Sequence, residues 1–481
     1  MAPEHAAHSE MIFEEDTRMT GVNGVTRTVE EEAVELRDEW LEHVFVPLRS
    51  TEWLRKEGHY RTFVKGRGVR VTDSLGKTFI DGASGWQYGA VGQGRTEIGE
   101  AMLAQMDEVA VVAPEYCAIP VMKLAAKIAE LTPGDLSRVA FCSTGSEAVE
   151  TALKMAKQYH VRQGEPMRHR VIARHGSYHG WTYGCMSVCG NRGLPIKEFE
   201  PLAPIGRFVH QPYCYRCELG LDYPSCDVRC ARDIETLIQF EGPETVSAVL
   251  AEPISHACYV AVPPAEYWPI VRSICDKYGV LLIVDEVITG FGRTGKWFAI
   301  SHWDVVPDIM TVAKGLTSGY IPAAGTIATT SVSNAFIGGD ETPFYQIATW
   351  GGSPIAAAGA LANIAIIERE NLVENSAKMG RVLLDGLDSL REYPIVGDVR
   401  GLGLCACIEL VADKKSKAGF APELAVIDRI YEGIEEGGLL AREFGSNILL
   451  TPPLPISQGE VEEVVAILDR VIATIAQEVS R

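Results

Sequence analysis

The sequence lacks any apolar run long enough to span a bilayer, and residues 1–20 lack the basic start and apolar centre of a signal peptide. We therefore expect a cytoplasmic protein with no membrane partner. Its 12 cysteines should then stay reduced, so no disulfide framework is predicted. Positive charge is scarce as well, with 44 Lys and Arg against 64 Asp and Glu, a formal net charge of −20. Such a chain repels phosphate backbones, which argues against a nucleic-acid partner.

The rest of the composition is typical of a globular protein, and 481 residues are enough for two or more domains. We predict an N-terminal arm with part of a small domain over residues 1–75. A large domain is predicted over residues 76–350, and a linking helix with a C-terminal small domain over residues 351–481. Within the first segment, residues 1–30 should be a loosely held arm, and the alternation over residues 68–82 predicts a hairpin. Helices are predicted over Glu30–His43, Ser353–Glu370 and Gln458–Gln477.

Short apolar runs alternate with longer helical patterns between about residues 100 and 330. Such runs are typical of buried strands in a mainly parallel sheet with helices between them, so an α/β fold is predicted. Ligands of these sheets usually bind at the carboxyl ends of the strands. The runs are Val139–Cys142, Arg170–Ala173, Ser247–Ala251, Leu281–Val284 and Ile309–Val312. Four of them end near a residue with obvious chemistry, and chance is the alternative explanation; the four are Ser143, Glu252, Asp285 and Lys314.

A candidate anion site follows the first of these runs. Small residues precede a helical pattern that begins near Ser146, which can cap the helix, while Glu147 favours its first turn. Backbone N–H groups at such a helix start can approach a phosphate, and the helix dipole adds to the attraction. A plain capped helix explains the same residues equally well.

A buried strand that ends in Asp285 places a carboxylate where it is costly unless it meets a positive partner. A protonated ring nitrogen is one such partner. Val287 lies two residues further on, so on a strand it would point to the same side and could cover one face of that ring. Tyr178 could stack on the other face. Core packing is the alternative for both side chains.

Lys314 follows an apolar strand and precedes a glycine-containing turn. Burial and a nearby cation lower the pKa of a lysine and favour the free amine that imine formation requires. The alternative is a surface lysine whose stem lies along apolar surface.

Taken together, these motifs resemble the class III (ω-type) aminotransferases of pyridoxal-phosphate (PLP) fold type I, over about residues 60–470. The resemblance implies a large domain with a mainly parallel, seven-stranded type of sheet flanked by helices. It also implies a smaller α+β domain built from both termini. The implied cofactor is pyridoxal 5′-phosphate, carried as a Schiff base on the catalytic Lys314.

The resemblance also implies the residues that hold the cofactor. Asp285 would bind the pyridine nitrogen, and Thr349 would reach the phosphate of a neighbouring subunit, although a helix cap is an alternative for Thr349. Glu252 would lie near the O3′ side of the ring, with a structural role equally open. The full set of cofactor residues is Thr144, Gly145, Ser146, Tyr178, His179, Glu252, Asp285, Val287, Lys314 and Thr349.

Two features bear on the substrate. Ile288 stands where ornithine- and aminobutyrate-type members often carry Gln, which favours the branch that transfers amines or ω-amino acids to pyruvate. Arg442 resembles the arginine that binds the substrate carboxylate in this branch, and a surface arginine is the alternative. Trp86, Gln87 and Tyr88 align with the region that lines the family's substrate pocket, with core packing as the alternative.

Cys214, Cys217, Cys226 and Cys230 form a CxxC followed by a CxxxC. This spacing is compatible with a four-thiolate zinc site, but the interval is short for a zinc module, and a reduced structural loop is the favoured interpretation. No metal is assigned to the active site.

The sequence therefore predicts a class III aminotransferase that moves an amino group from an amine or ω-amino acid to a keto acid, with pyruvate as the expected acceptor. A homodimer or a dimer of dimers with shared active sites is expected. The alternatives are another PLP reaction on the same fold, such as that of an aminomutase, racemase or decarboxylase, or a non-catalytic relative.

Overall fold

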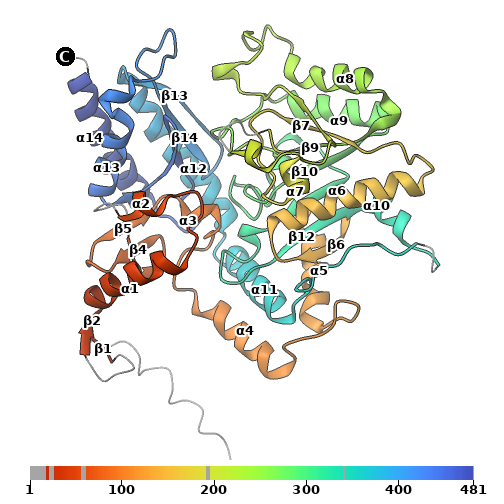
Figure 1. The fold of residues 1–481 in the computed structure, drawn as a ribbon, viewed down its shortest axis with the longest axis horizontal. Coiled ribbons are helices and arrows are strands. Elements are labelled where there is room, and N and C mark those ends of the chain that lie inside the picture. Colours follow the sequence, from red (N-terminus) through yellow and green to blue (C-terminus); the bar gives the residue numbers. More distant parts are fainter. Residues whose placement is uncertain (1–17, 21–25, 56–60, 191–194, 340–341, 480–481) are drawn as a thin grey trace, which may run out of the picture.

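The computed structural model describes residues 18–20, 26–55, 61–190, 195–339 and 342–479. Most of the arm predicted over residues 1–30 lies outside the described residues. The described chain forms two bodies that face one another, with a seven-stranded sheet in the larger one (Figure 1).

Seven strands form the sheet of the large domain in the order β6-β12-β11-β10-β9-β7-β8. Neighbouring strands are parallel except where β12 pairs with β11 and with β6. The prediction of a mainly parallel sheet is thus confirmed, and each of the five predicted runs lies in a strand. The strands are β6 (Leu136–Cys142), β7 (Arg170–Arg174), β8 (Gly206–Val209), β9 (Val246–Ala251), β10 (Leu281–Asp285), β11 (Ile309–Val312) and β12 (Ala324–Thr329).

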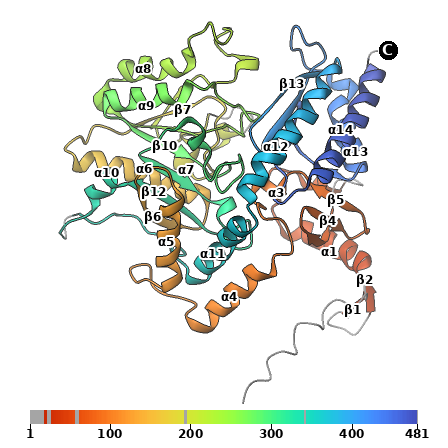
Figure 2. The ribbon, with the colours of Figure 1, turned by 180° about the vertical axis from the view of Figure 1, so that it is seen from behind.

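The central strands are apolar on both sides because helices cover both faces of the sheet (Figure 2). Leu250 and Ile283 pack in an apolar cluster with α6, whereas Val249 and Leu282 point the other way, into the main core. Every residue of β9, β10 and β11 is buried. The helices that contribute to these clusters include α5 (Ile119–Leu131), α6 (Gly145–Arg162), α8 (Arg229–Glu241), α9 (Tyr267–Tyr278) and α11 (Pro354–Arg369).

The smaller α+β domain is built from both ends of the chain, as predicted. Leu439 pairs in parallel with Ile80, which joins a C-terminal strand to the N-terminal hairpin. One sheet has the order β15-β5-β4-β3 and the other β13-β14-β17-β16. The strands are β3 (Phe63–Arg67), β4 (Arg70–Asp73), β5 (Thr78–Asp81), β13 (Val396–Gly401), β14 (Ala406–Leu410), β15 (Leu439–Leu440), β16 (Arg442–Phe444) and β17 (Asn447–Leu450). Its helices are α12 (Leu372–Ser389), α13 (Val426–Glu436) and α14 (Gln458–Val479).

The predicted hairpin is present as β4 and β5, and the three predicted helices are present as α1, α11 and α14. The division of the chain at residues 75 and 350 stays a prediction. In the described part of the chain, no helix is long and apolar enough to cross a membrane. The remaining elements are β1 (Arg18–Thr20), β2 (Thr26–Thr28), α1 (Val29–His43), α2 (Thr51–Arg55), α3 (Ser84–Gln87), α4 (Thr96–Glu108), α7 (Tyr183–Met186) and α10 (Thr330–Ser333).

Candidate active site

One cavity collects the residues that follow the carboxyl ends of β6, β7, β9, β10 and β11, together with parts of the small domain. This is where an α/β sheet is expected to bind its ligand. Among the predicted site residues, Tyr88 and Thr349 are the two that do not line it. The predicted residues that line it are Trp86, Thr144, Gly145, Ser146, Tyr178, His179, Glu252, Asp285, Val287, Lys314 and Arg442.

Lys314 lies in the turn after β11 and lines this cavity. Its φ of 34° is in the left-handed region, a strained conformation for a residue with a side chain. Desolvation and, after it, the positive charge of Arg442 lower the Lys314 pKa to about 7, although Asp285 acts in the opposite direction. Near neutral pH, a large share of this lysine is therefore the free amine that attacks a carbonyl.

Asp285 is the buried acid at the end of β10. Its Oδ1 accepts hydrogen bonds from the backbone N–H of Val287 and the hydroxyl of Thr311, both at 3.1 Å. Its Oδ2 lies 2.8 Å from Nδ1 of His179. These three contacts fix the direction in which the carboxylate points. A carboxylate that must face one particular atom of a ligand needs such a fixed direction.

Glu252 connects the strand end of β9 to the Tyr178 segment. Oε1 accepts from the backbone N–H of Tyr178 at 3.2 Å, and Oε2 accepts from Arg174 at 2.9 Å. Burial raises the Glu252 pKa, but His179 and Arg174 outweigh burial and leave that pKa below its usual value. Glu252 is therefore an ionised acid that holds the Tyr178 backbone in place.

The helix start after β6 has the features of a phosphate cradle. Thr144 is the N-cap of α6 and forms a capping box with Glu147, so the expectation that Ser146 caps the helix is wrong. The carboxylate of Glu147 accepts hydrogen bonds from the backbone N–H groups of Ser143 and Thr144. The Ser146 hydroxyl instead accepts from the N–H of Trp181 at 3.1 Å. The N–H of Glu147 donates to the Thr144 side chain, so the N–H groups of Gly145 and Ser146 are the ones left for an anion.

The two predicted covers of a ring both border the cavity. A Cβ added at Gly145 would lie 3.0 Å from Cγ1 of Val287, so only glycine lets the helix start approach this valine so closely. On the other side, burial raises the Tyr178 pKa to about 12, so its phenol is neutral at physiological pH. An uncharged aromatic face and an aliphatic face thus border the cavity.

Gln87 links the lysine to the predicted substrate arginine. Its Oε1 accepts a hydrogen bond from Arg442 Nη1 at 3.2 Å and from Lys314 Nζ at 3.4 Å. The guanidinium of Arg442 also lies over the ring of Trp86, 4.7 Å from its centroid. Both contacts of Arg442 are with neutral groups, so its charge is available to a substrate carboxylate.

Several lining residues were not predicted from the sequence. Gln87 belongs to the predicted substrate region but was not assigned a contact. His256 is buried beside the cavity, and burial, with the charges of Arg442 and Lys314, holds its pKa well below the usual value. The one signal in the sequence that points to His256 is its position. It comes four residues after Glu252, in the loop that follows a strand end. The other lining residues are Leu48, Gly180, Trp181, Ile254, Ala257, Ile288, Thr289, Ala313 and Phe444.

Tyr88 and Thr349 occupy other places. Tyr88 is 44% exposed, and its ring packs over Gly85 and Gly319, where an added Cβ would clash with it. Thr349 is exposed in the segment that precedes α11. Neither side chain borders the cavity of its own chain.

The residues present fit PLP. A lysine with a lowered pKa, a buried acid at a strand end and a helix start open to an anion match an aldehyde, a pyridine nitrogen and a phosphate. The glycine at position 145, where a Cβ would meet Val287, leaves a narrow space beside the helix start. Fold and cavity together define a PLP-dependent enzyme of fold type I.

Comparisons with known proteins give the family. The model of class III aminotransferases matches residues 54–472. The chain is 40% identical over 430 residues to a taurine–pyruvate aminotransferase of Bilophila wadsworthia, covering 86% of this chain and 92% of the relative. It is 36% identical over 434 residues to a putrescine–pyruvate aminotransferase of Pseudomonas aeruginosa, covering 89% and 93%. The chain belongs to the class III aminotransferase family.

Solved structures agree with the fold. An (S)-enantioselective ω-transaminase from Thermomicrobium roseum superimposes with a TM-score of 0.87 at 38% identity, over 92% of this chain and 99% of that one. A PLP-bound amine transaminase from an uncultivated Pseudomonas species has a TM-score of 0.85 at 36% identity, over 90% and 98%. The prediction of a PLP-dependent class III aminotransferase is confirmed at the level of fold, family and cofactor.

Proposed function

We propose that this aminotransferase uses an amine or ω-amino acid as donor and pyruvate as acceptor, with the cofactor attached through Lys314. The observation that carries the proposal is that Lys314 and Arg442 both donate a hydrogen bond to Gln87. This arrangement places in one cavity a lysine with a lowered pKa and a guanidinium that has no acidic partner among the residues that the structure describes. The similarity to a taurine–pyruvate and a putrescine–pyruvate aminotransferase supports pyruvate as the acceptor.

When bound, PLP supplies an electron-poor ring that stabilises negative charge at the substrate Cα. Asp285 would hold the ring nitrogen in its protonated form, and His179 fixes the direction of the Asp285 carboxylate. The first N–H groups of α6 would bind the phosphate, while Val287 and Tyr178 would cover the ring faces.

Lys314 then acts as an acid–base group at the substrate. As a neutral amine it would accept the proton from the substrate Cα, and as an ammonium it would hold that proton ready for return. A pKa near 7 suits this work because both protonation states are populated at neutral pH.

Arg442 binds the carboxylate of the keto acid. Its planar guanidinium can form two parallel hydrogen bonds with a carboxylate, which a neutral partner such as Gln87 cannot match. Gln87 holds the arginine in the absence of that carboxylate and releases it at low cost. An uncharged amine donor can then bind in the same cavity. The side chain of that donor need not lie against a fixed ion pair.

The active unit is a homodimer, or a dimer of dimers, in which Thr349 contacts the phosphate of the neighbouring subunit. Two observations support this part of the proposal. Thr349 is exposed and absent from the cavity of its own chain. The same segment exposes large apolar side chains, with Ile347 83% and Trp350 71% exposed, a pattern typical of an interface.

A cytoplasmic location is also part of the proposal. All 12 cysteines are free thiols in the structure, which fits a reducing compartment.

The test is a half-reaction followed by a donor screen. Holoenzyme is mixed with a candidate donor without any keto acid, and the cofactor spectrum is followed. Conversion to the aminated cofactor is expected with competent donors, and pyruvate should reverse it with release of alanine. An unchanged spectrum with every donor, together with racemised, rearranged or decarboxylated product, would instead identify another PLP reaction. A wild-type chain that binds no PLP would contradict the whole proposal.

A further inference from the structure

Two histidines lie side by side at the edge of the large sheet, outside the cavity described above. His175 directly follows β7 and His210 directly follows β8. These strands are parallel, with Arg174 opposite Val209, and the backbone N–H of His175 donates to the carbonyl of Val209 at 2.8 Å. The two ring centroids are therefore only 5.4 Å apart.

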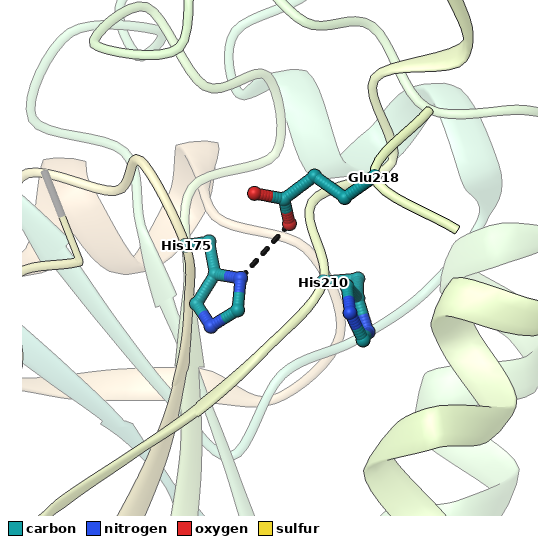
Figure 3. A group of neighbouring side chains, drawn as sticks. All are labelled: His175, His210 and Glu218. Atoms are coloured by element: carbon teal, nitrogen blue, oxygen red, sulfur yellow. Dashed lines mark hydrogen bonds and ion pairs between the residues drawn. The ribbon is translucent and has the colours of Figure 1, made fainter. Parts of the chain in front are cut away.

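An acid from a distant loop completes the group. Glu218 belongs to the cysteine segment, residues 211–230, and its Oε2 lies 2.9 Å from Nδ1 of His175. Figure 3 shows the carboxylate directed at His175, with His210 beside them. One ligand atom from each of the three residues lies within 4.8 Å of the other two. Across the ranges that the structure describes, no other group of His, Cys, Asp and Glu meets this criterion.

We propose that His175, His210 and Glu218 bind a divalent transition-metal ion of the zinc type. Two imidazoles and one carboxylate are ligands that Zn²⁺ uses, with water completing a tetrahedral site. All three side chains are partly exposed, so a hydrated ion can reach them.

A second carboxylate supports the assignment. Asp233 on α8 accepts a hydrogen bond from Nδ1 of His210 at 2.6 Å. Metal-binding histidines usually have such a partner on the ring nitrogen that does not bind the metal, because it fixes the orientation of the ring. Glu218 and Asp233 also place two carboxylates next to the two imidazoles, an arrangement that suits a divalent cation.

The four cysteines of the same segment are the rival ligands. They line one small pocket together, so their spacing does bring them into one region. However, no three of their thiols lie as close together as the ligand atoms of the His175 group. Burial also raises the Cys230 pKa to about 12, which disfavours the thiolate that zinc requires.

The ion would secure a segment that bridges the two domains. Tyr213 and Arg216, near the start of the cysteine segment, both contact the buried carboxylate of Glu409 in β14 of the small domain. Glu218, two residues beyond Arg216, is anchored to the large domain by His175. Metal binding at Glu218 should therefore tighten a connection between the large and small domains.

The experiment uses tag-free, chelator-treated holoenzyme dialysed against Zn²⁺, with metal content measured per chain and affinity by calorimetry. We expect one zinc per chain. Zinc-edge X-ray absorption should show nitrogen and oxygen neighbours at about 2.0–2.1 Å and no sulfur at about 2.3 Å. His210→Ala and Glu218→Gln should abolish the site, and Asp233→Asn should weaken binding by about 10- to 100-fold. Glu423→Gln, an exposed acid in the small domain, is the matched control and should bind zinc normally.

Each result of this experiment either supports or overturns the proposed zinc site. A wild-type chain that takes up no zinc would overturn it, and so would sulfur neighbours combined with loss of binding in Cys214→Ser/Cys226→Ser. The variants should keep the cofactor spectrum and the unfolding temperature of the metal-free wild type, which excludes misfolding as the cause. Metal content is measured independently of transamination, so failure here leaves the proposed activity untouched.

Discussion

Nδ1 of His179 lies 2.8 Å from Oδ2 of Asp285, and this contact joins two segments that are 106 residues apart in the sequence. It turns the carboxylate toward the cavity and leaves its other oxygen to Val287 and Thr311. His179 is thus a positioning residue for the acid that we propose to face the ring nitrogen.

Asp285→Asn should slow the half-reaction with a donor by about 10²- to 10³-fold, because an amide cannot stabilise the positive ring nitrogen. The cofactor should remain attached through Lys314. Single-turnover spectroscopy measures the rate, and Asp285→Glu should recover part of it. Equal rates for the Asn variant and the wild type would exclude the assigned role.

Lys314→Ala removes both the proposed point of attachment and the proposed acid–base group. Borohydride treatment should fix the cofactor to the wild-type peptide that contains Lys314 and to no peptide of the variant, as read by mass spectrometry. Donor turnover should fall by at least about 10²- to 10⁴-fold. Labelling of a different lysine in the wild type would show that the cofactor is attached there and not at Lys314.

The pH dependence of cofactor attachment should follow the lowered pKa of Lys314. The neutral amine is the reactive form, so the rate at which apoenzyme takes up PLP should rise as pH increases through about 7 and then level off. Arg442→Gln removes a positive neighbour and should move this midpoint to higher pH. Arg442→Lys keeps the charge and should leave it nearly unchanged. A midpoint near the ordinary lysine value in the wild type would contradict the burial of this amine.

Arg442→Met tests the carboxylate site. The KM for pyruvate should rise by about 10- to 100-fold, which is what the loss of a charge-assisted hydrogen bond costs. The half-reaction with an uncharged amine donor should change far less. If both half-reactions suffered equally, Arg442 would be a structural residue of the cavity and would not select the keto acid.

Trp350→Glu places a charge in the exposed apolar segment that we assign to the subunit interface. The variant should shift toward monomer in size-exclusion chromatography with light scattering, and it should lose PLP more readily because Thr349 leaves the phosphate. Phe240 is 84% exposed on α8 and provides the control, since Phe240→Glu should leave the oligomer intact. A wild type that is monomeric and active would rule out the shared site.

The sequence was most informative where short-range patterns fix structure. The central strand runs were recognisable because residues buried on both faces are mostly apolar, as in β9 and β10. Asp285 ends one such run and Lys314 comes two residues after another, so the topology of a parallel sheet brings them to one edge. The helix start was recognised too, but its cap was misplaced at Ser146, because Thr144 and Ser146 are both good caps and only the backbone geometry distinguishes them.

By itself, the sequence determined the family, the α/β fold and the residues at the strand ends, since these depend on local apolar patterns and on motifs of a few residues. Only the tertiary structure decided which side chains meet across the chain. Gln87 lies between Lys314 and Arg442 although it is 355 positions from the arginine, and Glu218 reaches His175 across 43 positions. Such contacts arise where two domains and a loop pack together, and no local pattern in the chain encodes that packing.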